Sequence, residues 1–415
     1  MLSVLDMSES PGYSFTMENY TIDILDNNDD NESYTLYNET YSNLSCSRND
    51  SLFYINVTLQ YPLELAMPLY GYALPVLFLV TTIANTLILA VLSQRHMRSP
   101  TNAVLMAMAL SDMLTVLFPE PMFFYMYTLN NHPKPLSPPS ACSAWMIMHE
   151  TIPNLFHTAS IWLTVVLVVQ RYIYVCHASV ARVWCTLPHV MRVIAFIFVL
   201  ATIHQAPRLF DTVYTPMMIE GDDECVEVCV MSYSSWVTDL LTLDIYFSCY
   251  YIFRVIFVHL GPCFVLVILN VLLYRAMRQA QKRRQKLFKE NDKKKECKKL
   301  RDDCTTLMLI VVVTVFLITE IPLAVITFLH VLSAKNIVQV FSDESYNIVN
   351  YFFIISNSFI IFSYPFNFAI YCGMSRQFRE TFRDLFIRGR RMPRRDDSTR
   401  YSMINGPPKT CSTEV

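Results

Sequence analysis

The sequence predicts an all-α membrane protein, a bundle of seven transmembrane helices followed by a short amphipathic inner-leaflet helix. Hydrophobic residues make up 53% of the 415-residue chain and charged residues only 16%, well below the roughly 25% of a soluble domain. Residues 67–92 and 346–372 contain no charged side chain, and about 20 apolar residues span a bilayer as a helix. Five further stretches are nearly as apolar. The seven predicted spans are 66–93, 102–128, 143–176, 191–210, 245–275, 303–332 and 346–373.

The distribution of Lys and Arg predicts how these spans are oriented, because cytoplasmic segments hold an excess of both residues. Thirteen basic residues lie between Arg275 and Arg301, and nine more lie between Arg376 and Arg400. Both segments are therefore expected in the cytoplasm. The amino-terminal region has a single basic residue, Arg48, and is expected outside the cell, with the whole chain in the plasma membrane.

The amino-terminal region also holds six Asn-x-Ser/Thr acceptors for glycosylation, which agrees with an extracellular position. They are Asn19, Asn31, Asn38, Asn43, Asn49 and Asn56. We expect residues 1–63 to form a disordered, glycosylated extracellular tail and residues 64–373 to form the transmembrane domain. Residues 374–388 place aromatic side chains on one side and arginines between them, as in a helix that lies along a membrane surface. Residues 389–415 are expected to form a disordered cytoplasmic tail.

Three of the 12 cysteines lie at the outer end of the third predicted span or in the loop before the fifth, where the extracellular environment allows disulfides to form. Cys142 lies at the outer end of the third span, and Cys225 and Cys229 lie in an acidic loop before the fifth. One bridge is expected, from Cys142 to either loop cysteine. Most of the other cysteines lie in or beside the spans, where a free cysteine behaves as a small hydrophobic residue.

Three spans carry distinctive motifs: Gln170-Arg171-Tyr172 closes the third span, Asp112 lies within the second, and FSYPFNFAIYCGMSRQFR closes the seventh. These motifs resemble those of rhodopsin-like (class A) G-protein-coupled receptors. The similarity covers the chain from about Tyr61 to Phe386. The strings LTVVLVVQRYIYVCHASVARVWCT and FAIYCGMSRQFRETF resemble the sex peptide receptor group, whose members respond to amidated myoinhibitory (allatostatin B) peptides.

This resemblance implies a receptor for an extracellular amidated neuropeptide that signals to an intracellular heterotrimeric G protein of the Gi/o type. The alternatives are a class A receptor for another amidated peptide, such as an FMRFamide-like one, or a membrane transporter or channel. The chain has neither the inverted repeats of transporters nor a catalytic motif, so we expect no enzyme activity. No nucleic-acid partner and no cofactor beyond a sodium ion is expected.

Five residues are expected to form the activation switch by resemblance. They are Arg171, Asp302, Phe316, Pro322 and Tyr371. Asp302 lies 20 residues before Pro322, or roughly 30 Å along a helix, so it reaches the same membrane face as Arg171. We expect these two to form an ion pair in the resting receptor. The alternative is that Arg171 only anchors its helix end among the lipid headgroups.

Asp112 is a carboxylate in the middle of the membrane, and such groups are usually functional because they are costly. The resemblance places it near Asn85, Ser160, Ser363 and Asn367, a set of oxygen-bearing side chains suited to sodium. A protonated Asp112 in a structural hydrogen-bond network is the alternative.

The ligand pocket is expected in the outer half of the bundle. Its candidates are Glu120, Phe124, Glu150, Asn154, Arg208, Arg254, Glu320, His330 and Tyr351. Glu320 stands where the sixth helix of the family usually has tryptophan. Glu320 and Arg254 are expected to pair either with each other, which we favour slightly, or with the ligand.

The carboxyl-terminal tail carries expected contacts with other proteins. Thr413, Glu414 and Val415 fit a Ser/Thr-x-apolar terminus that adds as a strand to a PDZ domain. Such tails also occur by chance. Serines and threonines nearby are candidate phosphorylation sites, and arrestin is a further expected partner.

Overall fold

The computed structural model describes residues 55, 57, 62–220, 225–287, 293–334 and 343–388. Within these residues seven helical spans are long and apolar enough to cross a membrane, which confirms the predicted fold class. The spans are Leu63–Leu92, Pro100–Thr128, Pro139–Cys176, Leu187–Leu209, Leu243–Gln279, Ile310–Leu329 and Tyr351–Gly373. Several predictions concern residues or side chains outside the described part: Asn19, Asn31, Asn38, Asn43, Asn49, Asn56, Asp302, His330, Thr413, Glu414 and Val415.

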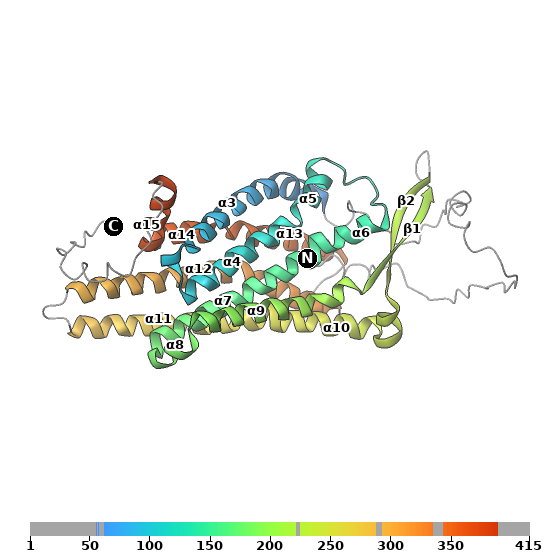
Figure 1. The fold of residues 1–415 in the computed structure, drawn as a ribbon. Coiled ribbons are helices and arrows are strands. Elements are labelled where there is room, and N and C mark those ends of the chain that lie inside the picture. The colour runs from blue at the N-terminus through green and yellow to red at the C-terminus, as the bar shows by residue number, and fades with distance from the viewer. Residues whose placement is uncertain are drawn as a thin grey trace, which may run out of the picture.

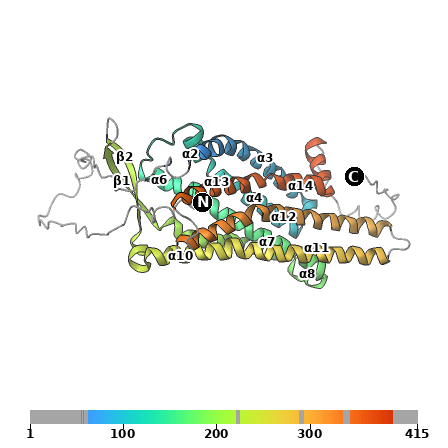
Figure 2. The ribbon, with the colours of Figure 1, turned by 180° about the vertical axis from the view of Figure 1, so that it is seen from behind.

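The spans pack lengthwise into one elongated bundle (Figures 1 and 2). The first span consists of α2 (Leu63–Ala66), η2 (Met67–Ala73) and α3 (Leu74–Leu92). The second consists of α4 (Pro100–Leu117), α5 (Glu120–Phe123) and η4 (Phe124–Thr128). The third consists of α6 (Pro139–Met146), η5 (Ile147–Thr151) and α7 (Ile152–Cys176). The fourth and fifth consist of α9 (Leu187–Gln205) and η6 (Ala206–Leu209), then α10 (Leu243–Phe253), η8 (Arg254–Leu260) and α11 (Gly261–Leu287). The sixth is α12 (Lys293–Ala334), and the seventh is α13 (Asp343–Ser363) with α14 (Phe366–Met374).

Shorter elements connect and end the bundle. They are η3 (Arg95–Met97), α8 (Ala178–Trp184), η7 (Trp236–Leu241), α15 (Arg376–Phe382) and η9 (Arg383–Ile387). The last two form the expected amphipathic helix, which turns away from the bundle axis (Figure 1). Ser375 caps it by accepting a hydrogen bond from the Phe378 backbone N–H at 3.2 Å. Phe378 is 1% exposed and packs against Tyr371, so this helix is fixed to the end of the seventh span.

Four spans contain a π-helical segment, in which each turn holds an extra residue. The segments are η2, η4, η5 and η8. Gly261 follows η8, and a Cβ there would lie 2.5 Å from the carbonyl oxygen of Ile256. Glycine is therefore required where this π-helical segment returns to α-helix.

The acidic loop before the fifth span is a β-hairpin, which the sequence analysis did not predict. Strands β1 (Thr212–Glu220) and β2 (Cys225–Tyr233) pair antiparallel, with Thr212 opposite Tyr233. The hairpin stands at one end of the bundle, opposite the end where α11 and α12 extend furthest (Figure 1). We call these the hairpin end and the opposite end.

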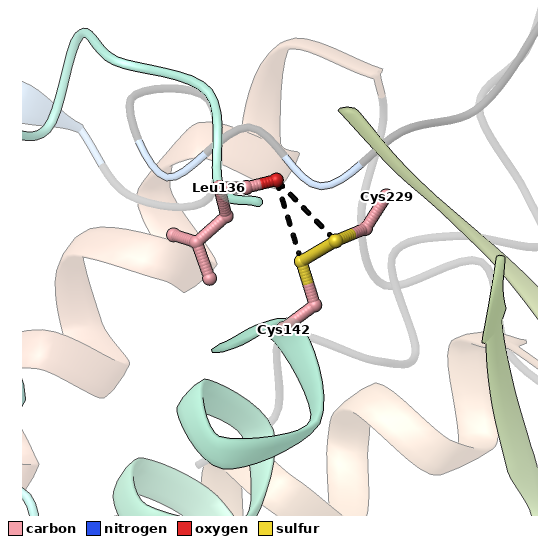
Figure 3. Close-up of a disulfide and its surroundings, with 3 residues drawn as sticks. All are labelled: Leu136, Cys142 and Cys229. Carbon is pink, nitrogen blue, oxygen red and sulfur yellow. Dashed lines mark hydrogen bonds between the residues drawn. A yellow bond between two sulfur atoms is a disulfide. The ribbon is translucent and has the colours of Figure 1, made fainter. Parts of the chain in front are cut away.

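A disulfide holds the hairpin to the bundle. Cys142 on α6 is bonded to Cys229 on β2, and the Leu136 carbonyl oxygen lies 3.5 Å and 3.3 Å from their sulfurs (Figure 3). The structure thus selects Cys229 rather than Cys225 as the partner. Cys225 is also disulfide-bonded, so the expectation of a single bridge is corrected. The Ile55 backbone N–H donates to the Cys229 carbonyl at 3.1 Å, and Ile55 is 1% exposed.

Many large apolar side chains on the spans face outward, among them Ile83, Phe196, Phe264 and Ile318, each at least 60% exposed. A soluble protein rarely exposes so much apolar surface, whereas a membrane solvates it. Polar and charged side chains are instead buried between the helices, and these make up the candidate site.

Candidate functional site

A cavity near the hairpin end lies between the first, second, third and seventh spans. It is lined by Tyr70, Thr115, Pro119, Phe123, His149, Pro153, His157, Asn357, Ile360, Ile361 and Tyr364. We call it the aromatic cavity. The rings of Tyr70 and Phe123 stack with centroids 4.6 Å apart in its wall. Most of its lining is apolar, as in typical small-ligand sites.

His157 lines this cavity and also contacts the buried carboxylate of Glu320. Glu320 Oε1 lies 3.2 Å from His157 Nε2, and Oε2 lies 3.6 Å from His259 Nδ1. His157 Nδ1 lies 3.3 Å from the Tyr364 hydroxyl. We call Glu320, His157, His259 and Tyr364 the latch cluster, since they join the third, fifth, sixth and seventh spans. Glu320 is 1% exposed.

The latch cluster holds a carboxylate that faces two imidazoles. No Lys or Arg pairs with Glu320 among the residues that the structure describes. A buried carboxylate without such a partner is costly. The described residues contain no group of three or more His, Cys, Asp or Glu suited to a metal ion.

A second cavity continues from the latch cluster to Asp112. Its lining includes Asp112, Ser160, Ser363, Asn367 and Phe316. Ser160 Oγ donates to Asp112 Oδ1 at 2.7 Å, and Asn367 Nδ2 donates to Oδ2 at 3.3 Å. Ser363 donates to the Ile360 carbonyl oxygen instead.

Asn85 belongs to the same predicted polar set but makes no contact of this kind. It is fully buried, and both polar atoms of its amide have no hydrogen-bond partner in the described part of the chain. The structure therefore brings Ser160 and Asn367 to Asp112, places Ser363 in the same cavity wall, and leaves Asn85 outside hydrogen-bond distance.

The predicted switch residues lie around this second cavity and at the opposite end. Phe316 lines the cavity, Tyr371 is 3% exposed, and Pro322 is exposed on the outside of α12. Arg171 lies half-buried near the end of α7. Its predicted pairing with Asp302 stays a prediction, because the Asp302 side chain is outside the described residues.

Arg254 does not pair with Glu320, which corrects the favoured expectation. The Arg254 guanidinium is 4% exposed and donates to Asn154 Oδ1 at 2.8 Å and to the Tyr250 hydroxyl at 3.4 Å. Arg254 contacts Asn154 and Glu320 contacts His157, three residues further along the third span, so each has its own partner there. The histidines that hold Glu320 were not among the predicted residues.

Arg208 forms a second buried ion cluster beneath the hairpin. It pairs with Asp211, and its Nη2 lies 3.4 Å from Glu150 Oε1. The Tyr246 hydroxyl donates to Asp211 at 3.0 Å. Burial raises the pKa of the Asp211 carboxyl above its usual range, against the opposing effect of the Arg208 charge. Asp211 was not predicted, although it lies only three residues after Arg208.

The remaining pocket candidates are separate from both cavities. Glu120 is 6% exposed, and its Oε2 has no hydrogen-bond partner among the described atoms. Tyr351 is half-buried. Phe124 is 42% exposed and is not among the residues that line these two cavities. His149, His157 and His259 could have been singled out by the rule that marked Asp112, since ionisable groups inside spans are rare.

Comparisons with known proteins agree with this geometry. A family model described as serpentine type 7TM GPCR chemoreceptor Srw matches residues 72–389. The sex peptide receptor of Drosophila melanogaster is 51% identical over 402 residues, which cover 97% of this chain and 91% of the relative. Sex peptide receptor-related protein 2 of Caenorhabditis elegans is 31% identical over 79% of this chain and 73% of its own length. The FMRFamide receptor of Drosophila melanogaster is 26% identical over 74% of this chain and 52% of its own length.

The seven spans, the buried polar path between them and the extent of these matches lead to one assignment. The chain belongs to the seven-transmembrane G-protein-coupled receptors and is similar over almost its whole length to the sex peptide receptor.

Proposed function

We propose that this chain is a plasma-membrane receptor for an amidated neuropeptide of the myoinhibitory or sex peptide type, and that it signals through a heterotrimeric G protein of the Gi/o type. The observation that carries the proposal is the continuous polar path from the aromatic cavity through His157 to Glu320 and on to Asp112. A ligand in the cavity would touch groups that join four of the seven spans. The names of the relatives, a sex peptide receptor and an FMRFamide receptor, support a peptide ligand.

In this proposal the hairpin end is extracellular and the opposite end is cytoplasmic. Of the 13 basic residues from Arg275 to Arg301, six lie in the last turns of α11 and six in the first turns of α12, at the opposite end. Cytoplasmic segments favour such charge. The Cys142–Cys229 disulfide lies at the hairpin end, where an oxidising environment would preserve it.

The proposed mechanism is a shift in the populations of two states. At rest, Glu320 on the sixth span is held by His157 of the third and His259 of the fifth. A peptide that binds better to a state in which these contacts are loosened would favour that state. The sixth span would then be free to move at its cytoplasmic end, where the G protein binds.

The residues around Asp112 fit a sodium ion. The carboxylate of Asp112, the hydroxyls of Ser160 and Ser363 and the amide of Asn367 line one cavity, and these are oxygen-bearing groups that a hard cation prefers. These four would hold the ion, which when bound would supply positive charge beside the Asp112 carboxylate. The alternative is a protonated Asp112 in the same hydrogen-bond network.

The proposal is tested by expressing the receptor and applying amidated neuropeptides while recording calcium and cyclic AMP. We expect Trp-amide myoinhibitory peptides to act at nanomolar concentrations and to lower cyclic AMP. A response to FMRFamide-like peptides alone would replace the ligand assignment, and a response without any change in cyclic AMP would contradict coupling through Gi/o. Arrestin and a PDZ-domain protein remain proposed partners of the carboxyl-terminal tail.

A further inference from the structure

His149 is a buried histidine that the latch cluster does not use. It lies on η5 in the third span, is 5% exposed and lines the aromatic cavity. Its Nδ1 is hydrogen-bonded to the backbone carbonyl oxygen of Trp145, one turn earlier. Its Nε2 has no hydrogen-bond partner among the residues that the structure describes.

The hydrogen bond to Trp145 fixes which nitrogen of His149 carries the proton. A carbonyl oxygen can only accept, so Nδ1 must donate, and in a neutral imidazole Nε2 is then an acceptor. No carboxylate of the described residues forms an ion pair with His149, which favours the neutral form in this buried place. The histidine therefore presents one buried, unsatisfied acceptor at the cavity.

The other polar groups around the cavity are mostly occupied. Thr115 Oγ1 donates to the Ser111 carbonyl at 2.9 Å, and Tyr364 and His157 contact each other. Asn357 contributes a half-buried amide from the seventh span. An unsatisfied buried acceptor is costly, so a ligand group that donates to it gains affinity.

The apolar walls define the shape and character of an occupant. The Phe123 ring meets His149 edge-on with centroids 6.0 Å apart and stacks on Tyr70. Pro119 and Pro153 add flat apolar surface. Rings prefer such surroundings, whereas a charged side chain would find no opposite charge in this lining.

We infer that the aromatic cavity is a subsite for one aromatic side chain of the ligand that carries a single N–H or O–H donor, the indole of tryptophan or the phenol of tyrosine. Its donor is directed at His149 Nε2. A phenylalanine ring would fill the space but leave this nitrogen unsatisfied. The inference rests on the proposed function in that the natural ligand is a peptide. Since His157 and Tyr364 also line the cavity, its occupant touches the latch cluster directly.

The first test uses small probes and does not require the natural peptide. N-acetyl-tryptophanamide and its indole-N-methyl derivative differ only in the donor, as do N-acetyl-tyrosinamide and its O-methyl derivative. Their binding to the purified full-length receptor in lipid nanodiscs is followed by saturation-transfer NMR. In the wild type we expect methylation of at least one pair to weaken binding about tenfold.

Variants at position 149 separate the hydrogen bond from packing. In His149→Phe the ring remains and the acceptor is lost, so methylated and unmethylated probes should bind equally. His149→Gln keeps an acceptor oxygen near the position of Nε2, so it should retain part of the preference for the unmethylated probes. This variant keeps the test decisive if His149→Phe fails to fold. His204→Phe is the matched control: His204 is half-buried, stacks on Tyr250 and lies outside the cavity, so the tenfold preference should persist.

Two results would overturn the inference. One is that neither unmethylated probe binds the wild type, and the other is that methylation weakens binding equally in the wild type and in His149→Phe. Once an active peptide is known, each of its tryptophans and tyrosines can be replaced singly by phenylalanine. One of these analogues should be less potent than the peptide on the wild type but equally potent on His149→Phe. If peptides activate the receptor and no analogue behaves in this way, the inference is wrong while the proposed function stands. If no peptide activates it, the proposed function fails while the probe test still reports on the cavity.

Discussion

Glu320 is a buried carboxylate held by two histidines rather than by an arginine. Its two oxygens lie 3.2 Å and 3.6 Å from imidazole nitrogens on the third and fifth spans. The contact can therefore be lost without moving a lysine or arginine out of the membrane. The contacts of Glu320 with His157 and His259 thus hold the sixth span in a way that a small change near His157 can release.

Removing the charge of Glu320 should raise basal signalling. In Glu320→Gln the side chain loses the negative charge that faces His157 and His259, so the resting contacts weaken and the active state gains population. We expect basal G-protein activation, normalised to the amount of receptor at the cell surface, to rise about three- to tenfold.

Glu380→Gln is the matched control for this change. Glu380 is exposed on α15 and pairs with Arg376, far from the latch cluster, so its basal activity should equal that of the wild type. Equal basal activity of Glu320→Gln and the wild type at equal surface density would contradict a restraining role.

The sequence indicated Glu320 and Arg254 as unusual polar groups but did not give their partners. Each partner lies on another helix, and the position of a residue along its own helix does not determine how two helices are rotated against each other. Arg254 meets Asn154, while Glu320 meets His157 only three residues further along the same helix. A displacement of only about 4.5 Å along the helix axis separates the two outcomes.

At the scale of the elements, the β-hairpin is held in position by its attachment to the helical bundle. The Cys142–Cys229 disulfide closes a loop of 87 residues that contains the whole fourth span. Cross-linking a loop of this length stabilises the folded state by about 4.6 kcal/mol in the chain-entropy model.

Breaking this disulfide should lower stability and surface expression. We expect Cys229→Ser to lower the melting temperature of the detergent-solubilised receptor by several degrees and to reduce the surface fraction. Cys249→Ser removes an exposed free cysteine and should change neither. A melting temperature of Cys229→Ser equal to that of the wild type would show that the hairpin is held by other contacts.

The ion cluster beneath the hairpin allows an independent test of the same element. In Arg208→Met the carboxylates of Glu150 and Asp211 stay buried without their cation, which should lower the unfolding free energy by about 3–5 kcal/mol. Arg192→Met, on the exposed side of α9, is the control and should have little effect. Thermal unfolding of both variants measures the difference, and equal melting temperatures would contradict the role of this cluster.

At the scale of the whole molecule, apolar length and charge placement were enough to predict seven spans and the amphipathic helix. These features can be predicted because the lipid bilayer requires long apolar helices, whichever helices they pack against. The hairpin was not predicted, since its strands are held partly by a disulfide and by packing on α6. The sixth predicted span, 303–332, lies inside a longer helix, because charged residues can continue a helix beyond the membrane.

Topology can be tested directly with epitope tags. An amino-terminal tag should be labelled on intact cells, whereas a carboxyl-terminal tag should be labelled only after permeabilisation. Treatment with an N-glycosidase should lower the apparent mass of the wild type but not of a variant in which all six acceptor asparagines are glutamine. Labelling of the carboxyl-terminal tag on intact cells would reverse the proposed orientation.

The π-helical segments have a consequence for comparative numbering. One extra residue in a helix rotates everything beyond it by about 100°. Counting from Arg171 or Gly261 toward the hairpin end as if the helix were α-helical throughout therefore assigns a residue to the wrong side of its helix once η5 or η8 has been passed. Pocket residues transferred by alignment from a receptor whose helices lack such segments would be misplaced in the first, second, third and fifth spans, unless the alignment allows for the extra residue in η2, η4, η5 and η8.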